Sequence, residues 1–449
     1  MRYPEDLEQT YKLCYDRFKP IMQKYLNISK EIILKHLGEI CISIYLIGSF
    51  GRDEGALYCE NGFIKPIRDF DILVITVKPV AQDIIRTITE EIHEKLDLPS
   101  PTKSVLEDFS IWITYVTISD LLIGVPLLKY YELKTASKHL HNTDIRNLIN
   151  IELADLSLYN GILILFTKVH GLLSLYPFSL ELQERILNYV YELIKTYTEI
   201  STVFSLLDRS IYKPTFYERC AEFHRVYSIK LPGLFKLIPE LNFYMPFICK
   251  RRKLLDHRLL NNLDLNVMSI HVTETLDKII ALYMKMGYGI NTPIQGFSKS
   301  SNNVLSRIGI VTLGEFFSSY LRKRGVHQEP LAKIIGLLLA AIYTQYSNIV
   351  FFIKARKEGL PVKSRLIFSM RNNFVYMTYV GINLMETLAY NDKDKLEAFE
   401  ELFLKKYLDS NYIKRLKDIK NLHRKKRIIV KLVTRLLRLA DISLHRKAF

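Results

Sequence analysis

The hydrophobic pattern changes character along the chain. Short apolar runs rich in β-branched residues occur between residues 42 and 122, whereas from about residue 151 apolar side chains recur at intervals of three and four. Short β-branched runs predict strands, and the three-to-four spacing predicts amphipathic helices. The sequence therefore predicts an α+β fold in which a small mixed β-sheet is followed by a large all-helical region.

Prolines and glycines that interrupt these patterns divide the chain into four predicted parts. A helical N-terminal arm covers residues 1–38, and the sheet domain covers residues 39–135. A helical domain over residues 136–230 is predicted to face the sheet across the site, and a C-terminal helical domain with a basic terminus covers residues 231–449.

The first predicted strand, residues 42–47, ends at a Gly48-Ser49 pair. The residues that follow, FGRDEGA, can begin a helix. Backbone N–H groups at such a bend, together with the Ser49 hydroxyl, are suited to bind a phosphate. Gly48 and Ser49 are therefore candidate phosphate-binding residues.

Arg52 lies one short turn after this bend, and two roles are open for it. Its guanidinium can bind the same phosphate oxygens as a charged fork, or it can form an ion pair with Asp53 or Glu54. Arg68, next to the aspartates described below, is interpreted as a neighbour that balances their charge.

A second strand is predicted over DFDILVITV, which begins with Asp69 and Asp71. Side chains alternate along a strand, so both aspartates point to one face and Phe70 points to the other. Two like charges on one face repel unless a cation lies between them, and Mg²⁺ prefers carboxylate and phosphate oxygens. Asn61-Gly62 predicts a hairpin that returns the chain and sets the two strands side by side.

The GSFGRDEG and RDFDILV blocks resemble the DNA polymerase β-like nucleotidyltransferase superfamily, and more narrowly a group of little-characterised microbial nucleotidyltransferase-like proteins. Residues 131–134, Tyr-Glu-Leu-Lys, are similar to a further stretch of that group. The resemblance covers residues 40–135, and weaker similarity extends to about residue 175. It implies an enzyme that uses Mg²⁺ or Mn²⁺ to transfer NMP from a nucleoside triphosphate to an acceptor hydroxyl of RNA, protein or a small molecule.

The same resemblance assigns roles to residues. Asp69 and Asp71 would hold the metal and act in catalysis, while Gly48, Ser49 and Arg52 would bind the triphosphate. The superfamily places a third carboxylate on a neighbouring strand, here matched by residues 109–122.

That position falls on Trp112, the only tryptophan of the chain. Asp108 has the same strand parity and is the candidate third acid, provided that a bulge or a shifted alignment brings it to the metal. The alternative is a catalytically lapsed protein of this fold that binds nucleotide or nucleic acid.

The charge is unevenly distributed. The chain has a formal net charge of +16, and residues 401–449 contain 15 Lys or Arg against 4 Asp or Glu. The pattern over residues 414–447 predicts a basic amphipathic helix. Such a helix can bind nucleic acid, lie on an anionic membrane, or dock its apolar face on the body of the protein.

One apolar segment, residues 334–353, carries no charge over 20 residues and is long enough to cross a bilayer. Its polar cluster of Thr344, Gln345, Ser347 and Asn348 disfavours a lipid environment. The sequence therefore predicts a buried helix of a helical domain and no transmembrane span.

The five cysteines are widely separated and form no C-x-x-C pair. This spacing predicts neither a zinc site nor a disulfide framework. The N-terminal residues MRYPEDLEQTYKL mix charges of both signs, which is not typical of a secretory signal. Together these features favour a reducing cytoplasm.

Overall fold

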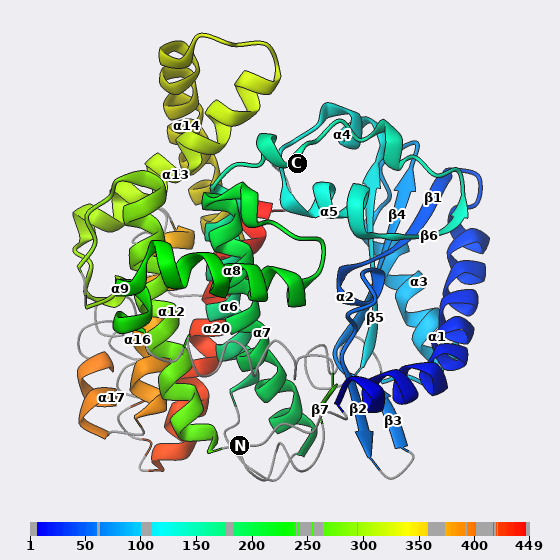
Figure 1. Ribbon diagram of the computed structural model, residues 1–449, viewed down its shortest axis with the longest axis horizontal. Helices are drawn as coiled ribbons and strands as arrows, with labels where there is room; N and C mark the ends of the chain where they lie inside the picture. The colour runs from blue at the N-terminus through cyan, green and yellow to red at the C-terminus, as the bar shows by residue number, and fades with distance from the viewer. Residues whose placement is uncertain are drawn as a thin grey trace.

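The computed structural model shows a sheet half and a helical half side by side (Figure 1), which confirms the predicted α+β fold. The structure describes residues 7–60, 63–99, 109–176, 183–238, 241, 254–255, 264–293, 295–357, 373–390, 393–400, 416, 419 and 421–445.

The main sheet has four strands in the order β5-β4-β1-β6. These are β1 (Cys41–Ile47), β4 (Asp69–Thr76), β5 (Ser110–Thr117) and β6 (Lys138–Asn142). β1 pairs antiparallel with β4 and with β6, and β4 pairs in parallel with β5. The two strands that carry the candidate residues are thus neighbours, as predicted. β6 extends the sheet beyond residue 135, where we had placed the end of the sheet domain.

One face of this sheet is covered by α1 (Leu7–Leu37) and α3 (Gln82–Lys95) (Figure 1). Phe70 is fully buried beneath them, and its ring lies 6.2 Å from that of Phe18, 4.6 Å from that of Phe50 and 4.9 Å from that of Phe109. Because side chains alternate along β4, this aromatic core turns Asp69 and Asp71 toward the opposite face.

A second, three-stranded sheet contains β2 (Leu57–Glu60), β3 (Phe63–Pro66) and β7 (Leu254–Leu255). β2 and β3 pair antiparallel with Glu60 opposite Phe63, so the predicted hairpin is present. Its turn residues, Asn61 and Gly62, lie outside the described residues.

Short helices lie between the strands and between the longer helices. They are α2 (Gly48–Gly51), α4 (Ile118–Ile123), α5 (Leu128–Ala136), and the 3₁₀ turns η1 (Arg146–Leu148), η2 (Leu153–Asp155), η3 (Arg209–Ile211) and η4 (Phe297–Lys299).

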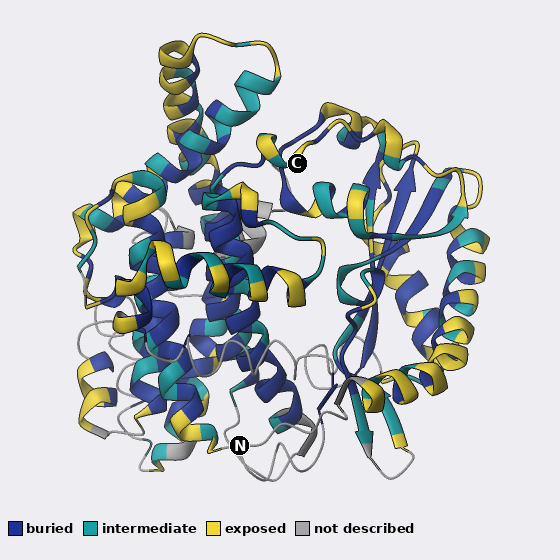
Figure 2. Ribbon diagram, in the orientation of Figure 1, coloured by how far each residue is buried: buried dark blue, intermediate teal, exposed yellow. Residues whose placement is uncertain are grey.

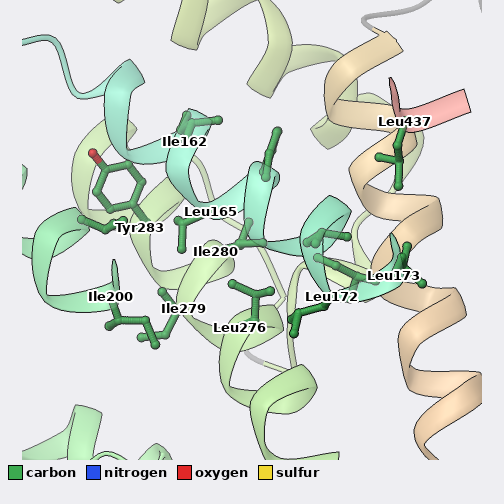
Figure 3. Packing of buried hydrophobic residues seen from close by; sticks show 14 of the residues in the cluster. Ile162, Leu165, Leu172, Leu173, Ile200, Leu276, Ile279, Ile280, Tyr283 and Leu437 are labelled. Atoms are coloured by element: carbon green, nitrogen blue, oxygen red, sulfur yellow. The ribbon is translucent and has the colours of Figure 1, made fainter. Parts of the chain in front are cut away.

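The helical half consists of longer helices, most of which follow the predicted apolar repeats. They are α6 (Tyr159–Leu175), α7 (Gln183–Leu207), α8 (Phe216–Lys230), α9 (Pro232–Leu237), α12 (Leu265–Tyr288), α13 (Asn302–Lys323), α14 (Glu329–Lys357), α16 (Asn373–Ala389), α17 (Lys393–Phe399) and α20 (Leu422–His445). Figure 2 shows that their buried side lies at the centre of this half. Leu165 of α6, Leu276 of α12 and Leu437 of α20 belong to this core (Figure 3).

α20 is the predicted basic amphipathic helix. Ile429, Val433 and Leu436 are buried against the body, while Arg424 and Lys431 are exposed. The apolar face therefore docks on the protein itself, which was one of the three alternatives. A nucleic-acid partner for residues 414–447 stays a prediction.

The cysteine prediction was wrong. Cys14 of α1 and Cys59 of β2 form a disulfide with their Cα atoms 6.4 Å apart, and Cys220 is also disulfide-bonded. The sequence spacing of the cysteines did not reveal this disulfide, because α1 folds back along the sheet and brings together residues that are 45 positions apart. Disulfides are typical of oxidising compartments, so the cytoplasmic location stays a prediction without support from the cysteines.

The prediction that residues 334–353 form a buried helix was also wrong, whereas the absence of a transmembrane span stays a prediction. These residues form the middle of α14, yet only 28% of its most apolar stretch is buried. α14 is the one helix among the described residues that is long and apolar enough to cross a membrane. The expectation that its polar cluster marks an interior helix failed because only Ser347 and Asn348 of that cluster are buried, while Gln345 is exposed on the side that carries large aliphatic side chains.

Candidate functional site: a cleft between the sheet and the helices

A cavity of about 310 Å³ lies between the two halves of the protein. Gly48, Ser49, Asp69 and Asp71 line it from the sheet side, together with Arg52 and Arg68. α5, which packs on β1, contributes Leu128, Lys129 and Glu132. Residues of α6, α7 and α8 close it from the helical side: Asn160, Leu163, Ile164, Tyr191, Lys195, Glu199 and Phe216. The structure therefore brings together the sequence-predicted site residues Gly48, Ser49, Arg52, Asp69 and Asp71, and Asp108 lies outside the described residues.

The two aspartates form the acidic wall. Asp71 lies between Ile47 of β1 and Trp112 of β5 in the sheet register. Burial, followed by repulsion from Asp69, raises the pKa of Asp71 to about 7. A carboxylate pair in this state gains from a cation, because the cation removes the repulsion that keeps one proton bound.

The Gly48 bend contacts the same carboxylate. Gly48 has φ +69°, and a Cβ at this position would lie 2.5 Å from Oδ2 of Asp71. Both the backbone conformation and the close approach require glycine here. The predicted helix after the bend is a single turn, α2, which ends before Asp53 at φ 58°.

Arg52 is held by carboxylates. Its Nη1 lies 3.0 Å from Glu132 Oε2, its Nε lies 3.4 Å from Glu54 Oε2, and the guanidinium stacks 4.5 Å from the centre of the Phe216 ring. Burial opposes its charge, but Glu132 and Glu54 outweigh burial and raise the pKa of Arg52. The ion-pair alternative is confirmed with Glu54, not with Asp53, which pairs with Lys138. Phosphate contact by Arg52 stays a prediction.

Glu132 connects Arg52 to a second arginine that sequence reasoning did not nominate. Arg219 of α8 is completely buried, and its Nη2 lies 3.0 Å from Glu132 Oε1. Arg219 also donates hydrogen bonds to Thr202 Oγ1 and to the Pro214 carbonyl. Burial would raise the pKa of Glu132, but Arg52 and Arg219 lower it, so its carboxylate stays ionised between them.

Glu54 makes a further connection across the cleft. Its Oε1 accepts hydrogen bonds from the backbone N–H groups of Phe216 at 2.7 Å and Tyr217 at 3.3 Å, the first residues of α8. A carboxylate at this end of a helix also interacts favourably with the helix dipole. Glu54 therefore positions Arg52 and anchors α8, and it does not line the cavity.

Two lysines that line the cavity form its basic wall. Lys129 begins α5, and Lys195 lies in the middle of α7. Within the described part of the chain neither has a carboxylate at ion-pair distance. Burial lowers the pKa of Lys129; for Lys195 burial acts in the same direction, but Glu192, Tyr191 and Glu199 raise its pKa. The available signal for Lys195 was its place in a largely apolar helix, where a lysine is unusual.

Arg68 adds a third cation, between the two walls. Its Nη2 lies 3.5 Å from Glu192 Oε2, and its pKa is raised by Glu192 and Asp69 against the effect of burial. Its interpretation as a neighbour that balances the aspartates agrees with this placement.

The third carboxylate that the resemblance implies is not found at its expected position. Trp112 stands opposite Asp71 in the register, at the position where the resemblance expects an acid, and Asp108 lies outside the described residues. Glu132 lines the cavity but is engaged by two arginines. Among the residues that the structure describes, no group of three or more His, Cys, Asp or Glu side chains is arranged to hold a metal. A cation here would therefore rely on Asp69, Asp71 and oxygens of its substrate.

Comparison with known sequences adds no family evidence. Neither the protein-family models nor the curated proteins contain a match to this chain. The nucleotidyltransferase assignment therefore depends on the residues and geometry described above.

Proposed function

We propose that this cleft binds a nucleoside triphosphate with Mg²⁺ or Mn²⁺ and transfers its NMP group to an acceptor hydroxyl on RNA, protein or a small molecule. The observation that carries the proposal is the contact between the Gly48 bend and the Asp71 carboxylate at the wall of a cavity that Lys129 and Lys195 also line. Anionic and cationic groups thus line one space, which is suited to a metal-bound polyphosphate.

The aspartates fit a divalent cation. Asp69 and Asp71 lie on one face of β4, and burial, followed by the charge of Asp69, raises the pKa of Asp71. Mg²⁺ is commonly held by one or two carboxylates together with substrate phosphates, which matches a site with two acids. When bound, such an ion neutralises charge that develops on the phosphate.

The other residues have positioning roles in this proposal. Backbone N–H groups after Gly48 and the Ser49 hydroxyl bind the outer phosphates, and Lys195 and Lys129 supply further positive charge. Arg52 is already oriented by Glu132 and Glu54, so its side chain needs little reorganisation to face a phosphate oxygen. Leu163 and Ile164 provide an apolar surface in the same cavity.

A second candidate function is nucleotide binding without transfer. Trp112 favours it, because an indole beside Asp71 supplies no base to activate the acceptor hydroxyl. The phosphate-binding part of the cleft is the same in both candidates.

The test is to incubate the purified protein with labelled nucleoside triphosphates, Mg²⁺ or Mn²⁺, and total cellular RNA or protein. We expect label transfer that falls more than about a thousandfold when Asp69 and Asp71 are both replaced by alanine. Asp83→Ala is the control, because Asp83 is an exposed acid on α3 with a side chain that is 83% exposed.

Nucleotide binding measured on the same variants separates the two candidates. Tight binding by the wild-type protein without transfer supports the binding module. Transfer that persists in the double variant contradicts the catalytic role of the aspartates, and absence of both binding and transfer contradicts both candidate functions.

A further inference from the structure

α14 presents a mostly apolar face to solvent, in which the exposed Gln345 lies between Ile342 and Ile349. Six aliphatic side chains on one side of this helix are each between 44% and 66% exposed: Leu331, Ile334, Leu338, Ile342, Ile349 and Ile353. Their spacing of three, four or seven residues places them on one stripe, which is about 33 Å long at 1.5 Å per residue. Exposed apolar patches of this extent mark interaction surfaces.

The opposite side of α14 is made mainly of small and polar residues, together with the buried Phe351 near its end. Ala332, Gly336, Ala340, Ser347 and Asn348 are oriented inward or partly inward, and four of them are buried side chains. A Cβ on Gly336 would lie 2.2 Å from the Ser318 hydroxyl and 2.6 Å from a backbone carbonyl of α13. α14 therefore packs on its neighbour through small residues at close range.

This distribution is the reverse of a soluble helix, in which large aliphatic residues face the core. Small residues at the helix–helix contact and large aliphatic residues outside are typical of helices that face lipid. No charged side chain interrupts residues 334–353. In Figure 1, α13 and α14 project together from the body, and Figure 2 shows exposed residues along the projecting part of α14.

We infer that the apolar face of α14 docks on an anionic phospholipid bilayer, with the helix lying along the membrane surface. A second copy of the chain is the less favourable occupant, because each copy carries a net charge of +16 and the copies repel each other, whereas anionic headgroups attract that charge. The helix does not cross the bilayer, because its other side is occupied by α13.

α13 also fixes the depth of this contact. Glu315 of α13 hydrogen-bonds Ser157 in the body, and Lys323 at the end of α13 pairs with Asp155. These bonds keep the α13–α14 hairpin attached to the sheet-proximal loops. Insertion is therefore confined to the exposed stripe.

The test is sedimentation of the full-length protein with vesicles of phosphatidylcholine, with and without phosphatidylserine. We expect binding to the phosphatidylserine vesicles, and we expect the variant Leu338→Gln plus Ile342→Gln to weaken it about a hundredfold without a change of charge. Ile229→Gln is the matched control, because Ile229 is an isolated apolar residue of α8 that is 77% exposed. Circular dichroism verifies that both variants are folded.

Three results would overturn the inference. They are no vesicle binding by the wild-type protein, equal binding to vesicles that lack phosphatidylserine, and a concentration-dependent dimer that the double variant abolishes. Nucleotide binding should be unchanged in the double variant, so the outcome is independent of the proposed function.

Discussion

The acidic wall and the basic wall of the cleft come from different kinds of structural element. The acidic wall comes from β4 and the Gly48 bend, which lie within 24 residues of each other in the sequence. The basic wall comes from Lys129 and Lys195, on helices α5 and α7 that other elements separate. Functional residues whose placement depends on strand alternation can be predicted from a sequence motif, whereas those whose placement depends on helix packing cannot.

The walls are joined by the chain Arg52–Glu132–Arg219. Arg52 comes from the sheet side and Arg219 from α8, and Glu132 of α5 bonds both. A buried carboxylate between two buried cations is strongly destabilised when one partner is lost. These ion pairs therefore determine how the two walls of the cleft are positioned relative to each other.

The largest effect is expected from Arg219→Met, which leaves Glu132 with one cation and removes bonds to Thr202 and Pro214. We expect the free energy of unfolding to fall by about 3 kcal/mol. Denaturant unfolding measures this change. Arg225→Met is the control, because Arg225 is 67% exposed on the same helix, and it should alter stability by less than about 0.5 kcal/mol. Equal losses of unfolding free energy in the two variants would contradict the structural role of the Arg52–Glu132–Arg219 ion pairs.

A smaller effect with a pH signature is expected from Asp71→Asn. The pKa of Asp71 is about 7 in the folded protein and 3.8 is its ordinary value, so the folded state holds a proton that the unfolded state releases between these pH values. Stability contributed by that proton is present below pH 4 and is lost as the pH rises through 7. Asparagine does not titrate, so the variant should exceed the wild type by about 2 kcal/mol at pH 8.

Denaturant unfolding of Asp71→Asn at pH 8 and pH 5, without divalent cations, tests this prediction. The advantage over the wild type should shrink at pH 5. The control Asp83→Asn should show no pH-dependent advantage, because Asp83 is exposed. An advantage of Asp71→Asn that is the same at both pH values would show that burial and repulsion do not act on this carboxylate as described.

The smallest effect is expected from Lys195→Gln on the basic wall. Loss of one cation should raise the Kd for a nucleoside triphosphate about tenfold, or about 1.4 kcal/mol, with less difference at high salt. Equilibrium binding of a fluorescent nucleotide measures it. Lys285→Gln on the exposed side of α12 is the control and should leave Kd unchanged. An unchanged Kd in Lys195→Gln would remove the basic wall from the binding site.

Much of the sheet side was predictable because its signals are local. Phe70 between two aspartates specified which residues share a face, and the Asn61-Gly62 pair indicated the hairpin that places β4 near β1. The third-acid position at Trp112 came from the family resemblance, and in the structure Trp112 pairs with Asp71 between β4 and β5.

The errors share one cause, since each concerns the environment that distant residues create. β6 joins the sheet through pairing with β1, and Cys14 reaches Cys59 only because α1 lies along the sheet. For α14, hydropathy and length do not distinguish a buried helix from an exposed one. Its environment depends on which side of the helix α13 covers.

The sequence by itself determined the α+β class, the convergence of Gly48 with the aspartate strand, and the amphipathic character of α20, because strand alternation, glycine conformation and helical periodicity are properties of adjacent residues. Only the tertiary structure decided that Arg52 is bound by Glu132, that Lys195 lines the same cavity as Asp71, and that α14 turns its large aliphatic side chains outward. Those outcomes depend on which helices pack together, and packing is a sum over contacts between residues far apart in the chain.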